Sequence, residues 1–407
     1  MYYLGKICPV SLIFFLLGLC HCSSTMVHKG TASYTVKRDS LILPGDYDLP
    51  KYFSQLKNQR VGLVIHPCSS IEGVLLLDTL IRLGINIKKV FSPEHGFRGD
   101  ADNGSEIPDQ IDPSTKLPIY SLYGKSKRPD AASLADLDVV VFDLQDVGVR
   151  FYTYLSTLTY IMEACARFNK KLIVLDRPNP NGFYVDGPVL DTCCHSFIGM
   201  HKIPVVHGMT LGELAQMIKG EGWIENAASL SMRVIPCINY THQSRYVLPV
   251  KPSPNLPDAR SILLYPSLCF FEGTIVSLGR GTDAPFQIYG HPDFRGGDTS
   301  FTPMPRTGSM EPPLSGKKCV GFSLKHIPLD DIYSKKEIDL NYLISAYQII
   351  GKRQDFFLPN RFFDLLAGNR LLRSQIISGM SKEDIRQSWD KDLTEFRELR
   401  KKYLIYK

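Results

Sequence analysis

The amino-acid sequence predicts an α/β protein whose main element is a doubly wound parallel sheet. Four short runs are rich in β-branched and aliphatic residues and do not alternate with polar ones, which is typical of strands buried on both faces. They are residues 61–65, 87–91, 139–142 and 172–175. Segments with helical spacing lie between the runs. This alternation favours right-handed βαβ units and therefore a sheet with helices on both faces.

Helices are predicted between and after these strands. At 75–83 and 154–168 apolar side chains recur every three or four residues, as on the buried face of a helix. Thr210 and Glu213 have the spacing of a capping box, which predicts a helix that starts there and ends at Gly220.

The sequence changes character near residues 258–261, where we place a domain boundary. Prolines precede an apolar run at 262–271, and a stretch rich in Gly, Pro and Ser at 296–316 predicts a long loop. Four further helices are predicted at 340–350, 362–366, 370–378 and 382–399. The expected domains are residues 40–258 and 261–407.

Residues 1–22 have the pattern of a secretory signal peptide. Lys6 precedes an apolar stretch that is too short to span a bilayer comfortably, and small or polar residues follow it. We therefore expect an exported and most simply periplasmic protein. Lipid attachment at Cys20 or Cys22 is the minor alternative, because the residue before each cysteine is not small.

Charge and cysteine content exclude some classes of function. The net charge of +6 comes without a basic block, so nucleic-acid binding is not indicated. The seven cysteines after residue 22 form no C-x-x-C pair, and the histidines show no H-E-x-x-H spacing, so no metal site is expected. No G-x-G-x-x-G, P-loop or G-x-S-x-G motif is present.

Three of the predicted strands, those ending at residues 91, 142 and 175, stop abruptly at ionisable residues. In an open parallel sheet the carboxyl ends of the strands share one edge, and ligands bind there. Loops that are far apart in sequence should therefore meet in one crevice.

Glu94 is the leading catalytic candidate. It stands between Pro93 and a glycine, which constrains its backbone, and Phe91 and Phe97 offer apolar neighbours that would raise the pKa of a general acid. A hydrogen-bonded loop anchor is the alternative role.

A second catalytic carboxylate is also expected. Glu272 is the first candidate for it, and Asp143 is the second. An ion pair with Arg280 is an equally good interpretation of Glu272. Arginines can clamp a carboxylate on the substrate, although internal ion pairs are common for them. Asp176 could instead cap a loop, and His207 could be an ordinary loop histidine. The candidate substrate contacts are His95, Arg98, Asp146, Arg150, Tyr152, Asp176, Arg177, Asn179, Asn181, His207, Arg280 and Asp283.

At these motifs the sequence resembles a known family. The segments FSPEHGFRGDADNG, VVVFDLQDVGVRFYTY, IVLDRPNPNG, PSPNLP and LYPSLCFFEGTIVSLGRGTDAPF together resemble the NamZ-type exo-β-N-acetylmuramidases, from about residue 61 to the C-terminus. The resemblance implies a Rossmann-like domain, a smaller C-terminal α+β domain and a site between them. It also implies release of N-acetylmuramic acid from the non-reducing end of peptidoglycan fragments in cell-wall recycling, with Glu94 as the catalytic glutamate. No cofactor, nucleic acid or stable protein partner is implied.

The resemblance leaves the stereochemistry open. A carboxylate spacing of about 5 Å would favour a retaining nucleophile, one of about 6.5–9.5 Å would favour inversion, and a route through the acetamido group of the substrate is a third option. The sequence departs from the family pattern at His66 and Leu75. Those departures support one alternative, a non-catalytic muropeptide receptor. A metal-dependent hydrolase built on Glu94, His95 and Asp100 is a weaker one.

Overall fold

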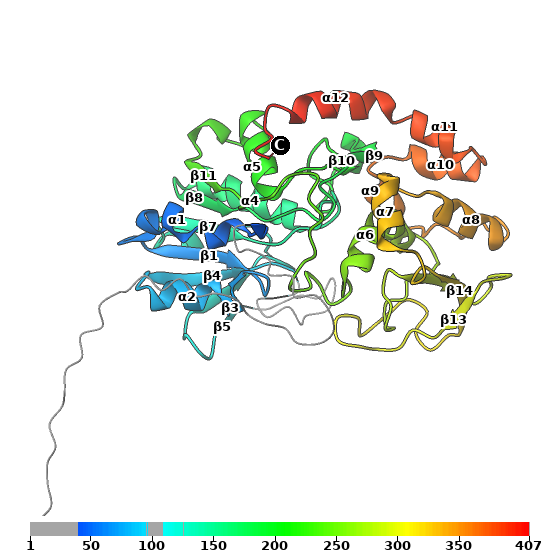
Figure 1. The fold of residues 1–407 in the computed structure, drawn as a ribbon, viewed down its shortest axis with the longest axis horizontal. Helices are drawn as coiled ribbons and strands as arrows, with labels where there is room; N and C mark the ends of the chain where they lie inside the picture. The colour runs from blue at the N-terminus through cyan, green and yellow to red at the C-terminus, as the bar shows by residue number, and fades with distance from the viewer. Residues whose placement is uncertain (1–39, 95, 97–108, 125, 407) are drawn as a thin grey trace, which may run out of the picture. The chain divides into compact units, whose positions relative to one another are not determined.

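A seven-stranded sheet is the largest element of the computed structural model, which describes residues 40–94, 96, 109–124 and 126–406 (Figure 1). Its strand order is β11-β8-β7-β1-β4-β6-β5, and every neighbouring pair is parallel except β5 with β6. The strands are β1 (Val61–Ile65), β4 (Ile87–Ser92), β5 (Gln110–Ile111), β6 (Pro118–Ser121), β7 (Val139–Asp143), β8 (Lys171–Leu175) and β11 (Met232–Ile235). The predicted doubly wound parallel sheet is confirmed.

The chain enters this sheet in the middle. From β1 it moves outward to β4 and β6, then returns to β7 on the other side of β1 and continues to β8 and β11. The direction therefore reverses between β1 and β7, the kind of point beside which ligands bind in open α/β sheets. The four predicted strands match β1, β4, β7 and β8 to within one residue at each end.

The sequence pattern does not reveal β6 and β11. β6 begins with Pro118 and is mostly half-buried, and β11 lies at the edge of the sheet with Arg233 exposed. Neither strand is buried on both faces, so neither has the continuous apolar run by which the central strands are recognised.

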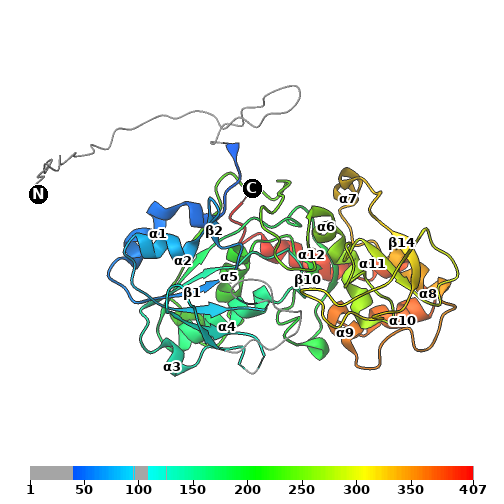
Figure 2. The same ribbon diagram turned by 90° about the horizontal axis from the view of Figure 1, so that it is seen from below.

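Helices cover both faces of the sheet. Leu63 of β1 belongs to an apolar cluster with α1 and α2, whereas the next residue, Val64, belongs to a cluster with α4 and α5. Figure 2 shows α1 and α2 on one side of the sheet and α4 on the other. These helices are α1 (Leu49–Leu56), α2 (Leu76–Arg82), α4 (Tyr154–Arg167) and α5 (Leu211–Gly220).

The predicted capping box opens α5. Thr210 Oγ1 accepts a hydrogen bond from the Glu213 amide (3.2 Å), and Glu213 Oε2 accepts one from the Thr210 amide (2.9 Å). Shorter elements complete this half of the chain. They are β2 (Ser70–Ile71), β3 (Val74–Leu75), α3 (Ala131–Leu134), β9 (Asp186–Val189) and β10 (Pro204–Val206).

After residue 258 the architecture changes to a small antiparallel sheet with helices. Its strand order is β12-β14-β13. The elements are α6 (Ala259–Leu268), β12 (Ile288–His291), β13 (Thr299–Phe301), β14 (Cys319–Ser323), α7 (Leu329–Lys335), α8 (Asn341–Ile349), α9 (Phe362–Ala367), α10 (Leu371–Ile377), α11 (Lys382–Gln387) and α12 (Asp390–Arg400). This confirms the smaller α+β region. Among the described helices, none combines the length and apolar character needed to cross a membrane.

The single helix predicted over residues 382–399 is wrong, because the chain forms α11 and α12 with a turn between them. Ser388 Oγ donates a hydrogen bond to the Ile385 carbonyl (2.6 Å), and such bonds compete with regular helix. The predicted apolar face is nevertheless buried, since Ile385, Trp389 and Leu393 are all at most 3% exposed.

The C-terminal segment returns to the large sheet, and Figure 1 shows the end of the chain beside α5. Arg400 Nη1 donates to the Gly208 carbonyl (2.7 Å). The Tyr406 hydroxyl donates to Asp176 Oδ2 (2.6 Å), just after β8. The last residues therefore support the carboxyl edge of the sheet.

Candidate active site

Asp143 and Arg177, at the ends of the neighbouring strands β7 and β8, form a buried ion pair. Arg177 donates from Nε to Asp143 Oδ1 (2.5 Å) and from Nη2 to Oδ2 (3.0 Å), and Nη2 also reaches Asp46 Oδ2 (2.6 Å). Burial raises the pKa of Asp46 to about 7, with Arg177 opposing the shift and Asp143 adding to it. Asp143 and Arg177 are thus engaged with each other inside the fold.

Asp176 has the environment of a loop cap. Its Oδ1 accepts a hydrogen bond from the Gly212 amide (2.8 Å), and its Oδ2 accepts one from Thr210 Oγ1 (2.6 Å) in addition to that from Tyr406. Burial raises the pKa of Asp176 to about 6. The carboxylate therefore joins β8, α5 and the C-terminal segment.

The two asparagines after β8 also fasten loops to one another. Asn179 Nδ2 donates to the Met209 carbonyl (2.8 Å). Asn181 Nδ2 donates to the carbonyls of Val147 (2.8 Å) and Ile262 (3.2 Å). Asn181 therefore links the loop after β7 to the start of α6.

Arg150 is fully buried and bonded to main-chain oxygens. Its Nη1 donates to the carbonyls of Pro188 (2.8 Å) and Ile203 (2.9 Å), and its Nη2 to that of Leu366 (2.9 Å). Gly368, at φ +79°, lies against the guanidinium, and a side chain there would collide with it. Arg150 thus joins the β9–β10 hairpin to α9.

Asp146 and His207 are buried in the loops near the sheet edge. Asp146 Oδ2 accepts from the Gly148 amide (2.6 Å), and burial raises the pKa of Asp146 to about 7. His207 Nδ1 accepts from the Met209 amide (3.2 Å), and burial lowers its pKa to about 3. Neither residue is among the described residues that line the cavity around Glu94.

A cavity of about 250 Å³ brings Glu94 together with Glu272 and Arg280. Its walls are largely aromatic and come from both halves of the chain. The other lining residues are Tyr123, Phe151, Tyr152, Thr153, Tyr154, Phe197, Ile198, Ser253, Asn255, Leu256, Tyr265, Cys269, Phe286, Phe362 and Leu366. A site with apolar walls and a few convergent polar groups is the usual form of a small-molecule site.

Glu94 is held at the end of β4 and is 8% exposed. Its Oε2 accepts a hydrogen bond from Thr153 Oγ1 (2.7 Å), and its side chain also bonds to that of Tyr123. The Tyr154 hydroxyl donates to the Glu94 main-chain oxygen (3.4 Å). The start of α4 therefore fixes both the backbone and the carboxylate of Glu94.

Glu272 and Arg280 form an ion pair. Both residues follow the domain boundary that the sequence predicts, whereas Glu94 precedes it. Arg280 donates from Nε (3.0 Å) and from Nη2 to the same Glu272 oxygen. Although burial disfavours the charged guanidinium, Glu272 raises the pKa of Arg280. The Arg280 guanidinium also lies 5.0 Å from the centre of the Phe286 ring. The carboxylate is thereby fixed beside a permanent cation.

Several cavity residues are not evident from the sequence. Tyr123 follows β6, and because the sequence pattern does not reveal that strand, Tyr123 is not recognised as a residue at a strand end. Phe197 lies on the connection between β9 and β10 and carries no local signal. Of the sequence candidates, Tyr152 lines the cavity and donates from its hydroxyl to the Pro252 carbonyl (3.1 Å).

Three other candidates lie elsewhere or outside the described residues. Asp283 is exposed and pairs with Arg306. His95 and Arg98 are outside the described residues, as is Asp100 of the metal alternative. Within the residues that are described, no group of three or more His, Cys, Asp or Glu side chains could hold a metal ion.

Of the two positions that depart from the family pattern, His66 directly follows β1 and Leu75 ends β3. His66 is buried, its Nε2 accepts from the Gln145 amide (3.4 Å), and its ring packs edge-on against Tyr154 (5.2 Å). Leu75 packs against the apolar cluster of α1 and α2. Neither belongs to the described lining of the Glu94 cavity.

Comparisons with known proteins cover nearly the whole chain. Two family models, described as the N-terminal and C-terminal parts of exo-β-N-acetylmuramidase NamZ, match residues 61–260 and 263–406. The chain is 38% identical over 394 residues to the peptidoglycan β-N-acetylmuramidase NamZ of Bacillus subtilis, covering 91% of this chain and 93% of that protein.

Two crystal structures of DUF1343-family proteins from Bacteroides fragilis have the same fold. The first has a TM-score of 0.83 and 44% sequence identity, and covers 90% of this chain and 99% of that one. The second has a TM-score of 0.75 and 29% identity, and covers 91% and 100%.

Proposed function

Because the chain belongs to the NamZ family of exo-β-N-acetylmuramidases, we propose that it is an exo-acting glycoside hydrolase of peptidoglycan fragments. It releases N-acetylmuramic acid from their non-reducing ends. The observation that carries the proposal is the cavity of about 250 Å³ in which Glu94 faces the same space as the Glu272–Arg280 pair.

Glu94 acts as the general acid in this proposal. Glycoside hydrolysis needs one carboxyl group that protonates the departing oxygen. A second carboxylate attacks the anomeric carbon, activates a water molecule for that attack, or stabilises the positive charge that develops there. Glu94 is positioned by the hydroxyls of Thr153 and Tyr123, which can orient the carboxyl group whether or not it carries the proton. Replacing Glu94 should therefore lower kcat more than it weakens substrate binding.

Glu272 is the second carboxylate. It lines the cavity, whereas Asp143 is bonded to Arg177 inside the fold. Arg280 donates two hydrogen bonds to one oxygen of Glu272, and these bonds hold the carboxylate in a fixed position in the cavity. The role of Glu272 is nucleophile, water-activating base or orienting group for the acetamido substituent.

The lactyl carboxylate of muramic acid needs a cation for recognition. Of the three arginines suggested by the sequence, Arg280 lines the cavity, while Arg150 and Arg177 are bonded to internal groups. We assign the recognition of the lactyl group to Arg280. Tyr152 and the other aromatic side chains form the wall against which the sugar ring packs.

We also propose that the protein is exported. The apolar segment near the N-terminus supports a cleaved signal peptide and a periplasmic location. A role in cell-wall recycling follows from the proposed activity on peptidoglycan fragments. Sequencing the N-terminus of the protein recovered from cell fractions tests this. A mature start at or near residue 23 without lipid supports cleavage, and a lipid on Cys20 or Cys22 supports the membrane-anchored alternative.

The enzyme is tested with a chromogenic β-N-acetylmuramic acid glycoside and its N-acetylglucosamine counterpart. The proposal predicts release from the muramic acid glycoside and little from the other. Binding without release from either would favour a receptor. Retention of full activity in a chelator would remove the metal-dependent alternative.

A further inference from the structure

Two aromatic side chains, Tyr123 and Phe197, form the wall of the Glu94 cavity on the side of the proposed general acid. The Tyr123 side chain bonds to the Glu94 carboxyl group, and the centres of the Tyr123 and Phe197 rings lie 6.1 Å apart. Both side chains are half-buried, whereas Tyr154 and Phe286, which also line the cavity, are only 1% exposed. The cavity therefore reaches the surface beside Glu94, at these two rings.

A tight turn presents Phe197 to the cavity. The main chains of Ser196 and Gly199 exchange two hydrogen bonds (2.9 and 3.0 Å), so Phe197 stands at the tip of the turn between them. The Phe197 carbonyl accepts a hydrogen bond from Ser156 Oγ (2.6 Å) on α4. The start of the same helix holds Glu94, so the ring and the carboxyl group are both fixed by α4.

The aromatic wall holds two cations. Lys127 Nζ lies 4.3 Å from the centre of the Phe197 ring and 5.8 Å from that of the Tyr123 ring. The Arg128 guanidinium lies 4.2 Å from the centre of the Tyr160 ring, which stacks on Phe197 at 5.9 Å. The negative face of an aromatic ring attracts a cation, so these contacts hold both charged groups in place.

The two cations differ in their partners. Arg128 Nη1 lies 3.4 Å from Glu163 Oε2, which balances its charge. Lys127 has no carboxylate partner among the residues that the structure describes. Tyr123 contacts Glu94 through its hydroxyl and Lys127 through its ring, so a ligand that passes Glu94 comes within reach of the ammonium group. An ammonium without a partner in this position is suited to bind an anionic group on that ligand.

The proposed mechanism fixes the side on which the departing sugar lies. The general acid protonates the glycosidic oxygen, so the departing sugar lies beside Glu94, and the second carboxylate acts from the opposite face. Glu272 and Arg280 also border a second cavity of about 870 Å³, which therefore lies on the attacking side. The departing glycan must then leave the site past Tyr123 and Phe197.

We propose that Lys127 binds the lactyl carboxylate of the second muramic acid of the glycan, on the leaving-group side of the scissile bond. This deepens the proposed function and rests on it. The two sugars of peptidoglycan alternate, so a free lactyl group can recur on every second sugar. Arg280 takes the carboxylate of the terminal sugar and Lys127 takes that of the third sugar. The rings of Tyr123 and Phe197 contact the N-acetylglucosamine between them.

The first experiment compares two trisaccharides that differ by one lactyl group. Both begin with N-acetylmuramic acid and N-acetylglucosamine, and the third sugar is N-acetylmuramic acid in one and N-acetylglucosamine in the other. At low ionic strength the wild-type kcat/KM should be about three- to fivefold higher for the first. Equal values would overturn the proposal. A chromogenic muramic acid glycoside, which has no third sugar, reports separately on the proposed function.

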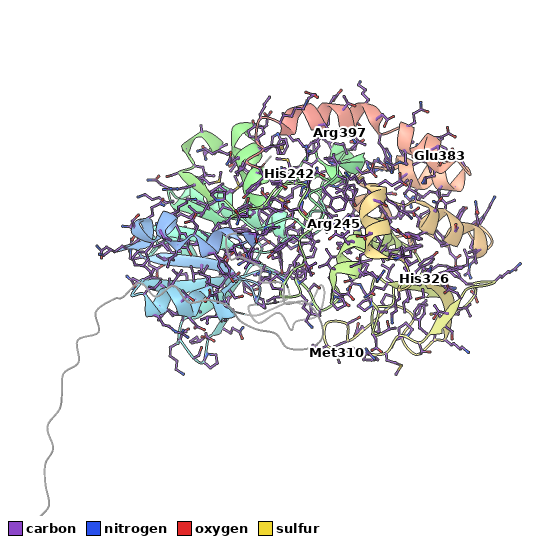
Figure 3. All side chains as sticks on the ribbon, in the orientation of Figure 1. His242, Arg245, Met310, His326, Glu383 and Arg397 are labelled. Carbon is purple, nitrogen blue, oxygen red and sulfur yellow. The ribbon has the colours of Figure 1, made fainter. Side chains whose placement is uncertain are left out.

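The second experiment removes the charge of Lys127. In Lys127→Gln the ratio of the two kcat/KM values should fall to about one, because the variant cannot distinguish the lactyl group. Arg245→Gln is the matched control and should keep the wild-type ratio. Arg245, labelled in Figure 3, also lies over a tyrosine ring (4.8 Å from the centre of Tyr333), and neither residue belongs to the described lining of the two cavities. A wild-type ratio in Lys127→Gln contradicts the assignment.

A binding measurement does not depend on turnover. The disaccharide product, N-acetylglucosamine linked to N-acetylmuramic acid, differs from di-N-acetylchitobiose by the same lactyl group. In calorimetry the wild-type protein should bind the product about three- to fivefold more tightly, and Lys127→Gln should bind the two equally. Equal affinities in the wild type, or binding of neither sugar, would overturn the proposal. Preferential binding without hydrolysis of any glycoside would support the carboxylate site and contradict the proposed function.

Discussion

Arg150 donates a hydrogen bond from Nη2 to the carbonyl oxygen of Leu366 (2.9 Å), across 216 residues of sequence. Leu366 lines the Glu94 cavity, so this bond connects the loop after β7 to a wall of the candidate site. Arg150 looks in the sequence like a carboxylate clamp, but the fold uses it to join distant segments.

Replacing Arg150 with Met should destabilise the protein. The carbonyls of Pro188, Ile203 and Leu366 would lose their donors, and the expected cost is about 2–4 kcal/mol in the free energy of unfolding. Denaturant unfolding measures this, with Arg167→Met at an exposed position as a control that should change stability by less than about 0.5 kcal/mol. A raised KM with unchanged stability would instead support the clamp.

The buried aspartates should contribute stability that is lost as the pH rises from about 4 to about 7, while the lowered pKa of buried His207 acts in the opposite direction. Burial raises the pKa of Asp46 and Asp146 to about 7 and that of Asp176 to about 6, from 3.8. The native state therefore holds protons that the unfolded state has already released in this window, and their contribution to stability is lost as the pH passes the raised pKa values.

Asp146→Asn should reduce this pH dependence. Asparagine can still accept the hydrogen bond from the Gly148 amide, and it removes the charge that ionisation would bury. At pH 8 the variant should be more stable than wild type by roughly 1–3 kcal/mol, and at pH 4 the difference should be small. Thermal unfolding across this range is the measurement. Asp392→Asn, at an exposed site, should follow the wild-type curve.

Glu272 and Arg280 should behave as one unit in catalysis. Glu272→Gln should lower kcat/KM for the muramic acid glycoside by about 10²–10⁴, and the loss in the Glu272→Gln, Arg280→Gln double variant should be smaller than the product of the two single losses. Arg306→Gln breaks the exposed pair with Asp283 and serves as the control, with activity near wild type. Additive losses in the double variant would show that the pair does not act together.

Much of the fold follows from local patterns, but the site does so only in part. Buried parallel strands have unbroken apolar runs, so β1, β4, β7 and β8 are visible in the sequence, and Glu94 follows one of them. The partners of buried polar groups are set by tertiary contacts. No local pattern shows that Arg177 is bonded to Asp46, 131 residues away, or that Tyr123 reaches Glu94.

His66→Asn should have little effect on catalysis. His66 packs against Tyr154 behind the cavity and is not part of its described lining, so kcat/KM for the muramic acid glycoside should stay within about threefold of wild type. Steady-state kinetics with circular dichroism as a folding check measures this. A change of 100-fold in a folded variant would mean that the departure from the family pattern alters the site.

Glu94→Gln tests the central claim most directly. The measurement is kcat and KM of this variant and of wild type on the chromogenic muramic acid glycoside and on the natural disaccharide. We expect kcat to fall by about 10²–10⁴ on the disaccharide, less on the chromogenic substrate because its leaving group needs less protonation, and KM to change little. Unchanged turnover on both substrates would contradict the assignment of Glu94 as the general acid.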